Sequence, residues 1–367
     1  FLQCKTFGSH KVPEGWIIVA AGNPPEYNKS VREFDIATLD RIKKIDVEAD
    51  FEVWKEYAKQ ADIHPAILSF LTAKPQYFYQ VETTVDGPVF ATPRGWEDLS
   101  RFLTVYEKLG LSCDREVVAQ YIPHGRIARD FASYLELYYK YQAQYQIDQA
   151  LSGHRSEALL EQAARAPFDE KLSVISLVLA KLNVEFRKTG KMEDGLELLF
   201  EKLKEFKGRL AENGDGAPVR RLTAFVGEVR EEFEEKKQVG LLTRAQIHRY
   251  EDVCGTLGWY LLEAGETEGQ DGEALFGMLA SRFGTERERY EEQCRAALKM
   301  VEYAFDFMEG AFGDSQEMVI FITELNTSYD AVRFLEENPC ERYYQYNRKL
   351  LFEDREAELK KKLDRLL

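Results

Sequence analysis

The chain has 367 residues and a formal net charge of −15, and 44% of its residues are hydrophobic while 31% are charged. This composition is typical of a globular protein and leaves room for two or three domains. The acidic balance argues against a nucleic-acid partner, because binding a phosphate backbone needs basic side chains. No apolar run reaches the roughly 20 residues that a membrane-spanning helix needs.

The cysteines and histidines predict neither a disulfide framework nor a metal site. Five cysteines are scattered along the chain, an odd number, without any Cys-x-x-Cys pair. The five histidines are also dispersed and never have His-x-x-x-His spacing. We therefore expect free thiols in a reducing cytosol, and the predicted localisation is cytoplasmic.

The first predicted element is a strand at residues 16–21, an uninterrupted apolar run (Trp-Ile-Ile-Val-Ala-Ala). Such a run is typical of a strand buried on both faces of a parallel sheet. It ends at Gly22-Asn23-Pro24-Pro25, where the prolines prevent further pairing. Because ligands of open α/β sheets bind beyond the carboxyl ends of the strands, Asn23 is placed to meet a bound group. Residues 42–47 predict one more short strand.

The next hundred residues predict a small helical region. Asp50 is a candidate N-cap for a helix over 51–59, and a second helix starts at His64-Pro65. Residues 81–91 alternate and turn like a small hairpin or an ordered loop. Thr92 at N-cap and Pro93 at the first helical position predict a helix that runs to about residue 109. Two more helices are predicted over 114–121 and 126–146.

From about residue 151 the sequence predicts long, charged, leucine-rich helices without strands. Their apolar residues recur at spacings of three and four. The predicted helices are 156–164, 169–187, 192–211, 219–237, 243–264, 273–308 and further helices to the end of the chain. Residues 213–218 (Asn-Gly-Asp-Gly-Ala-Pro) give the strongest linker signal.

Three of these motifs, taken in order, resemble the second half of an AAA+ ATPase core. Within that group, the residues of the motifs are most similar to those of MoxR-type ATPases. The three motifs are Gly22-Asn23-Pro24, Thr38-Leu39-Asp40-Arg41 and Thr92-Pro93-Arg94. The resemblance covers residues 1–148. It implies an α/β remnant of an AAA+ core, then an α-helical lid and a mostly α-helical C-terminal region, so that the chain is predominantly α overall.

The resemblance also implies roles for three residues. Asn23 would be the catalytic sensor 1, which orients the water that attacks the γ-phosphate. Arg41 would be the catalytic arginine finger, offered to the nucleotide of the neighbouring subunit, and Arg94 would be the nucleotide-binding sensor 2. Arginine suits both roles because its charge is permanent and its planar fork matches phosphate oxygens. The alternative interpretation is that Asn23 caps a turn, Arg41 pairs with a surface carboxylate and Arg94 is a solvated first-turn arginine.

The predicted domains are the C-terminal part of the nucleotide-binding core (1–48), the lid with sensor 2 (49–148) and an acidic all-helical region (149–367). A further division of the last region is predicted near 212–218. The motif G-x-x-x-x-G-K-[ST] occurs nowhere in the 367 residues. The resemblance therefore implies a chain whose Walker A and Walker B half lies upstream. ATP and Mg²⁺ would bind to the intact parent, and the chain alone is expected to be inactive.

Two functions remain open at this point. In the first, the chain is part of an ATPase that couples ATP hydrolysis in a ring to chaperone-like remodelling or maturation of a partner protein. The ring would be a hexamer of its own subunits by family analogy, and a von Willebrand factor A domain protein is the partner that the resemblance suggests. In the second, it is a non-catalytic helical interaction module with a degenerate AAA+ core. We expect neither nucleic acid nor a membrane as a partner.

Overall fold

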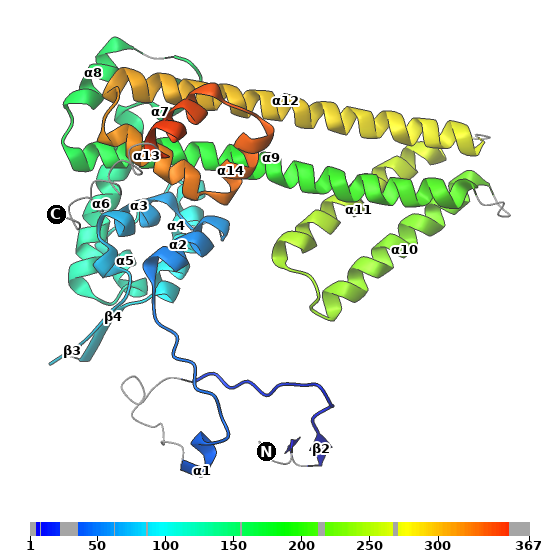
Figure 1. Ribbon diagram of the computed structural model, residues 1–367, viewed down its shortest axis with the longest axis horizontal. Coiled ribbons are helices and arrows are strands. Elements are labelled where there is room, and N and C mark those ends of the chain that lie inside the picture. The colour runs from blue at the N-terminus through cyan, green and yellow to red at the C-terminus, as the bar shows by residue number, and fades with distance from the viewer. Residues whose placement is uncertain are drawn as a thin grey trace, which may run out of the picture. The chain divides into compact units, whose positions relative to one another are not determined.

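The computed structural model describes residues 5–7, 9–22, 36–61, 63–85, 87–154, 156–211, 217–266 and 271–351. The chain divides into two compact units, Phe1–Asp50 and Phe51–Leu367. Figure 1 shows the helices and strands of both. Among the described residues no helix is both long enough and apolar enough to cross a bilayer.

The first unit has little regular structure. Its strands β1 (Thr6–Phe7) and β2 (His10–Lys11) pair antiparallel, with Thr6 opposite Lys11, and its helix α1 spans Ile36–Leu39. The remaining described residues of this unit are irregular.

The strand predicted at residues 16–21 is wrong for this structure, because these residues are irregular and three of their apolar side chains lie in solvent. Trp16 is 65% exposed, Ile17 84% and Val19 85%. The short strand predicted at 42–47 is also absent, and Ile45 and Val47 are exposed. A strand obtains its hydrogen bonds from neighbouring strands. Within the described residues no strand pairs with either segment.

The second unit is almost entirely helical, which confirms the prediction of a predominantly α chain. Its elements before residue 168 are α2 (Phe51–Gln60), α3 (Pro65–Ala73), η1 (Pro75–Tyr77), β3 (Gln80–Thr84), β4 (Gly87–Ala91), α4 (Pro93–Leu109), α5 (Arg115–Tyr121), α6 (Gly125–Gln144), α7 (Ile147–Ala150) and α8 (Glu157–Arg165). The later elements are α9 (Phe168–Ala211), α10 (Pro218–Gln238), α11 (Arg244–Gly265), α12 (Gly272–Phe312), α13 (Gln316–Thr327) and α14 (Tyr329–Glu337). Residues 341–351 are helical as well.

Local capping chemistry fixes several of the predicted boundaries. The Thr92 hydroxyl accepts a hydrogen bond from the Gly95 amide at 3.2 Å, and α4 ends at Leu109 before Gly110, whose φ is 67°. A left-handed residue after the last turn is a common helix stop, and glycine adopts it without strain. Residues 81–91 form the expected hairpin, because β3 and β4 pair antiparallel with Gln80 opposite Ala91.

The prediction of two separate helices over 169–187 and 192–211 is wrong, since α9 is one helix of 44 residues. The predicted break fell at Thr189-Gly190. Thr189 is buried and its hydroxyl donates to the carbonyl of Phe186, so it bonds within the helix. A side chain at Gly190 would lie 3.6 Å from the guanidinium of Arg333, which packs over this point from α14. Tertiary packing therefore carries the helix through a sequence of low intrinsic propensity.

Two hydrophobic cores hold the second unit together. The proximal core is built from α2 to α8, the first part of α9, the last part of α12, α13 and α14, so it includes elements from both sides of residue 148. The distal bundle consists of the end of α9, α10, α11 and the start of α12, around a core that includes Phe206, Phe225 and Leu257. Helices α9 and α12 lie side by side, as Figure 1 shows. Both helices contribute residues to both cores.

Candidate functional site

The three residues predicted to contact nucleotide fall in different parts of the chain. Asn23 lies outside the described residues. Arg41 belongs to the first unit, where it is exposed just after α1 and its amide donates to the carbonyl of Thr38 at 3.1 Å. Arg94 belongs to the second unit and is exposed in the first turn of α4. Each arginine is therefore accessible to a ligand within its own unit.

The start of α4 is held rigidly from several sides. Next to Arg94, the indole N–H of Trp96 donates to the carbonyls of Tyr77 and Phe78 at 3.3 and 3.2 Å, and the ring is fully buried. A Cβ on Gly95 would lie 2.6 Å from the carbonyl oxygen of Tyr121, so only glycine allows α5 to approach this closely. The backbone that carries Arg94 is thus fixed by a cap, a buried ring and a neighbouring helix.

The electrostatics at this point favour an anion. The first turn of α4 contains no acidic residue, and the N-terminus of a helix carries the equivalent of about half a positive charge. Among the described residues the Arg94 side chain makes no ion pair or hydrogen bond, so its guanidinium is available. A helix start with an available arginine can bind a phosphate group. The nucleotide-binding role of Arg94 stays a prediction.

A second candidate is a cavity of about 430 Å³ inside the second unit, which sequence reasoning did not predict. It lies between α3, α6 and α9, with further lining from α2, α13 and α14, and we call it the α9 cavity. Its lining includes small residues of two helices, namely Ser69 and Thr72 on α3, and Ser176 and Ala180 on α9. These small side chains leave the space open. Serine, threonine and alanine are ordinary residues within each helix, so the sequence carries no signal that could have predicted the cavity.

Tyrosine hydroxyls supply much of the polarity around the α9 cavity. The hydroxyls of Ser69 and Tyr134 lie 2.5 Å apart, and the Tyr145 hydroxyl donates to Glu170 at 2.6 Å. Burial raises the pKa of Tyr134, although hydrogen bonds with Ser69 and Ser173 act in the opposite direction. These tyrosines remain protonated at neutral pH, so they act as hydrogen-bond donors rather than as bases.

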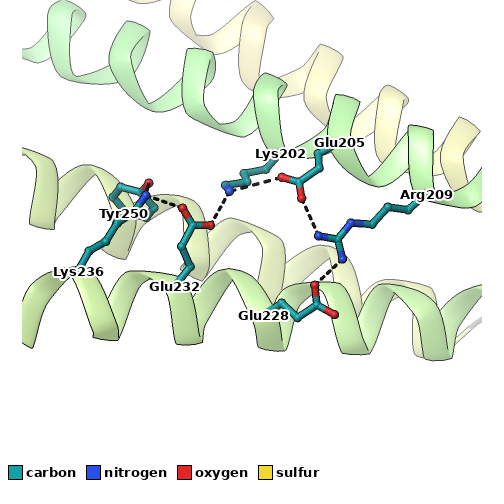
Figure 2. Close-up of polar contacts among 7 residues, drawn as sticks. All are labelled: Lys202, Glu205, Arg209, Glu228, Glu232, Lys236 and Tyr250. Atoms are coloured by element: carbon teal, nitrogen blue, oxygen red, sulfur yellow. Dashed lines mark hydrogen bonds and ion pairs between the residues drawn. The ribbon is translucent and has the colours of Figure 1, made fainter.

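Another polar cluster lies between α9 and α10, and Figure 2 shows its seven residues. They are Lys202, Glu205, Arg209, Glu228, Glu232, Lys236 and Tyr250. The central pair is Lys202 and Glu232, whose Nζ and Oε2 atoms are 2.8 Å apart. Hydrogen bonds from Lys202 and Lys236 lower the pKa of Glu232. An acid–base catalyst needs a pKa near the working pH, so a shift away from neutrality indicates a structural ion-pair network.

The cysteines that the structure describes are buried free thiols, namely Cys113, Cys254, Cys294 and Cys340. Burial raises the pKa of Cys113 and of Cys340 to about 11, so neither is a reactive thiolate. The described residues contain no group of three or more histidine, cysteine or carboxylate side chains that could hold a metal ion. Comparison of the chain with models of protein families, with curated proteins and with solved structures found no match.

Proposed function

We propose that this chain is part of a MoxR-type AAA+ ATPase that couples ATP hydrolysis in a ring to chaperone-like remodelling of a partner protein. In this proposal Asn23 orients the attacking water, Arg41 stabilises the γ-phosphate of the neighbouring subunit's ATP, and Arg94 contacts the phosphates in its own subunit. ATP and Mg²⁺ are the ligands of the whole protein, and a von Willebrand factor A domain protein is the proposed partner.

The observation that carries the proposal is the geometry around Arg94. An exposed arginine follows a Thr-Pro cap at the start of a 17-residue helix, on a backbone fixed by the buried Trp96. An arginine in a first turn is unfavourable for the helix dipole, which prefers an acidic residue there. Its presence is explained if an anion binds at this point, because the guanidinium and the helix N-terminus then attract the same phosphate.

The first unit supports the proposal independently. Trp16, Ile17 and Val19 are exposed in a run that would suit the interior of a parallel sheet. Exposing such residues is costly, at about 25 cal/mol for each Å² of apolar surface left in water. In the proposed ATPase, the strands that carry Walker A and Walker B would pair with this segment and cover it.

The test uses the protein expressed from its whole reading frame. We expect steady-state ATP hydrolysis, and the Arg41→Ala variant should lower kcat by about 10³–10⁵-fold while leaving ATP affinity largely unchanged. Arg94→Ala should weaken nucleotide binding. Arg101→Ala is the matched control, because Arg101 is another exposed arginine on α4 that is paired with Glu97 in the same helix. Absence of ATPase activity in the whole protein, or of a G-x-x-x-x-G-K-[ST] motif, would overturn the proposal.

A separate measurement addresses the chain of 367 residues by itself. Because the phosphate-binding motif is absent from this sequence, Mg-ATP should leave its melting temperature unchanged. An increase of several degrees would contradict the assignment of the phosphate cradle to residues outside this chain. Loss of ATP binding in Arg41→Ala of the whole protein would instead give Arg41 a role in its own subunit.

The distal bundle favours the second candidate function, a non-catalytic interaction module. On α11 the side chains of Trp259 and Leu262 are 75% and 66% exposed, three residues apart on one helical face. Exposed aromatic residues of this kind are enriched in protein interfaces. The interaction module would be the correct function, and the ATPase the wrong one, if two results were obtained. The whole protein would hydrolyse no nucleotide, and it would bind its partner with the same affinity in the presence and absence of ATP.

A further inference from the structure

The α9 cavity has the size and wall composition of a site for a small organic molecule. Its volume of about 430 Å³ falls in the range of about 300–1,000 Å³ that is typical of ligand pockets. Its apolar walls include Leu68 on α3, Leu172 and Leu179 on α9, and Ile320 on α13. A hydrocarbon chain placed between these helices would be removed from water, which is favourable in proportion to the apolar area buried.

The charges on the cavity wall are unbalanced. The lining contains five carboxylates and three basic side chains. Lys55 lies 2.6 Å from Glu324, and Lys74 lies 3.7 Å from Asp130, so these two bases already have carboxylate partners. Arg187, the third base, lines the same cavity as Asp330. Beside this one arginine, the wall carries three further carboxylates, Asp169, Glu170 and Asp330.

Asp169 and Glu170 lie in the first turn of α9 without a cationic partner. Within the described part of the chain neither carboxylate is in ion-pair distance of a lysine, arginine or histidine. Glu170 accepts a hydrogen bond from Tyr145 at 2.6 Å, and Asp169 is exposed at the edge of the cavity. The N-terminus of α9 carries the equivalent of about half a positive charge, which offsets only part of the two negative charges, so the pair still attracts a cation.

Tyrosine rings complete the surroundings of these carboxylates. Burial, and then the charge of Glu170, raise the pKa of Tyr141, with a smaller contribution from Asp169. Tyr134 and Tyr141 line the same cavity as the two carboxylates. Aromatic faces attract cations through their quadrupole, and the combination of rings with carboxylates is suited to an ammonium group.

We propose that the α9 cavity binds an aliphatic ammonium ion, whose hydrocarbon chain lies between α3 and α9 and whose nitrogen lies against Asp169 and Glu170. This inference is independent of the proposed ATPase function, because it uses no residue of the three nucleotide motifs. The ligand would lie where α3 and α6 pack against α9.

The test is isothermal titration calorimetry of the 367-residue chain with hexylammonium chloride and with 1-hexanol. The two probes have the same hydrocarbon chain and differ in charge, so the hexanol titration isolates the apolar contribution. We expect hexylammonium to bind at least tenfold more tightly than hexanol. Failure of hexylammonium to bind at 10 mM, or equal affinity for both probes, would overturn the proposal.

Variants separate the charged end of the site from the apolar one. Asp169→Asn and Glu170→Gln should each weaken hexylammonium about tenfold, as expected for losing a charge-assisted contact, while hexanol affinity stays within twofold. Ser176→Leu should fill the cavity and abolish binding of both probes, with the helical circular dichroism retained. Asp252→Asn, an exposed carboxylate on α11, is the matched control and should change nothing. Unchanged hexylammonium affinity in both carboxylate variants would refute the assignment.

Discussion

Replacing Glu232 by glutamine removes the centre of the ion-pair network between α9 and α10 that Figure 2 shows. Glu232 accepts from the Lys202 Nζ at 2.8 Å and from the Lys236 Nζ at 2.5 Å. The Lys202 side chain is only 12% exposed, and its other carboxylate, that of Glu205, lies 3.5 Å away. The glutamine has nearly the same shape, so the variant tests the charge rather than the packing.

The expected loss of stability follows from the partial burial of this pair. Breaking a fully buried ion pair costs about 3–5 kcal/mol, whereas an exposed pair contributes about 0–1 kcal/mol. Glu232 is 37% exposed, which discounts the larger figure, and Lys202 keeps its contact with Glu205. We therefore expect Glu232→Gln to lower the free energy of unfolding by about 1.5 kcal/mol at pH 7.

The pH dependence of this loss has a definite sign. The pKa of Glu232 is lowered from 4.5, so its contribution is present above that value and is lost as the pH falls through the folded-state pKa. Burial lowers the pKa of Lys202, but hydrogen bonding with Glu232 and the nearby carboxylate charges outweigh this effect and raise it above 10.5. Its contribution is therefore present below 10.5 and is lost as the pH rises through the folded-state pKa. The effect of the variant should be constant around neutral pH and shrink at both extremes.

The assay is urea unfolding of four proteins, the wild type, Glu232→Gln, Lys202→Met and the double variant. Their double-mutant cycle isolates the interaction between the two residues, and we expect a coupling energy of about 1 kcal/mol. Glu234→Gln, an exposed carboxylate two residues along α10, should change stability by less than about 0.5 kcal/mol. A coupling energy below about 0.3 kcal/mol, or an undiminished effect at pH 3, would refute this account of the network.

Three further substitutions test other parts of the second unit. Gly95→Ala should cost about 1–3 kcal/mol in thermal melts because its Cβ would meet the Tyr121 carbonyl, whereas Gly208→Ala in open space on α9 should stabilise the protein. Glu107→Gln should cost about 0.5 kcal/mol at pH 7, because Glu107 is 42% exposed and solvent screens the contact. A hydrogen bond from the buried His64 at 3.0 Å lowers the pKa of Glu107, so its contribution disappears as the pH falls below 4.5. Leu257→Ala should cost about 2–5 kcal/mol, because it opens a cavity in the distal core. Amide hydrogen exchange should become faster in the distal bundle but not in α3 of the proximal core. Equal acceleration of exchange in both would contradict separate cores.

Helix starts could be predicted from the sequence because capping is local chemistry. Thr92, Asp114 and Ser156 each accept a hydrogen bond from an amide two or three residues later, and each starts a helix close to the predicted position. The start of α4, and with it Arg94, was therefore predictable. The hairpin of β3 and β4 was predictable for the same reason, since alternation and turn residues specify it within eleven residues.

Features that depend on distant partners could not be predicted in this way. The apolar run at 16–21 favours a strand, but a strand forms only where neighbouring strands accept its hydrogen bonds. Continuity of α9 through Gly190 depends on Arg333, more than a hundred residues away. The α9 cavity depends on the packing of α3 against α9, which places Ser69 and Ser176 in one lining, and neither residue is unusual within its own segment.

The two long helices determine how the distal bundle is attached. At about 1.5 Å per residue, the 44 residues of α9 extend about 66 Å, and the helix contributes to both cores without a loop between them. Near the point where one core gives way to the other, Arg333 lies 2.6 Å from Glu193 and 2.8 Å from Asp194.

A hinge between the proximal core and the distal bundle would have to bend both α9 and α12, because each runs through the junction without interruption. Bending a continuous helix disrupts its backbone hydrogen bonds, whereas a loop absorbs the same rotation freely. The second unit is therefore built to transmit a rotation rather than to absorb it. If nucleotide binding at Arg94 turned the proximal core, the same turn would reach the exposed face of α11.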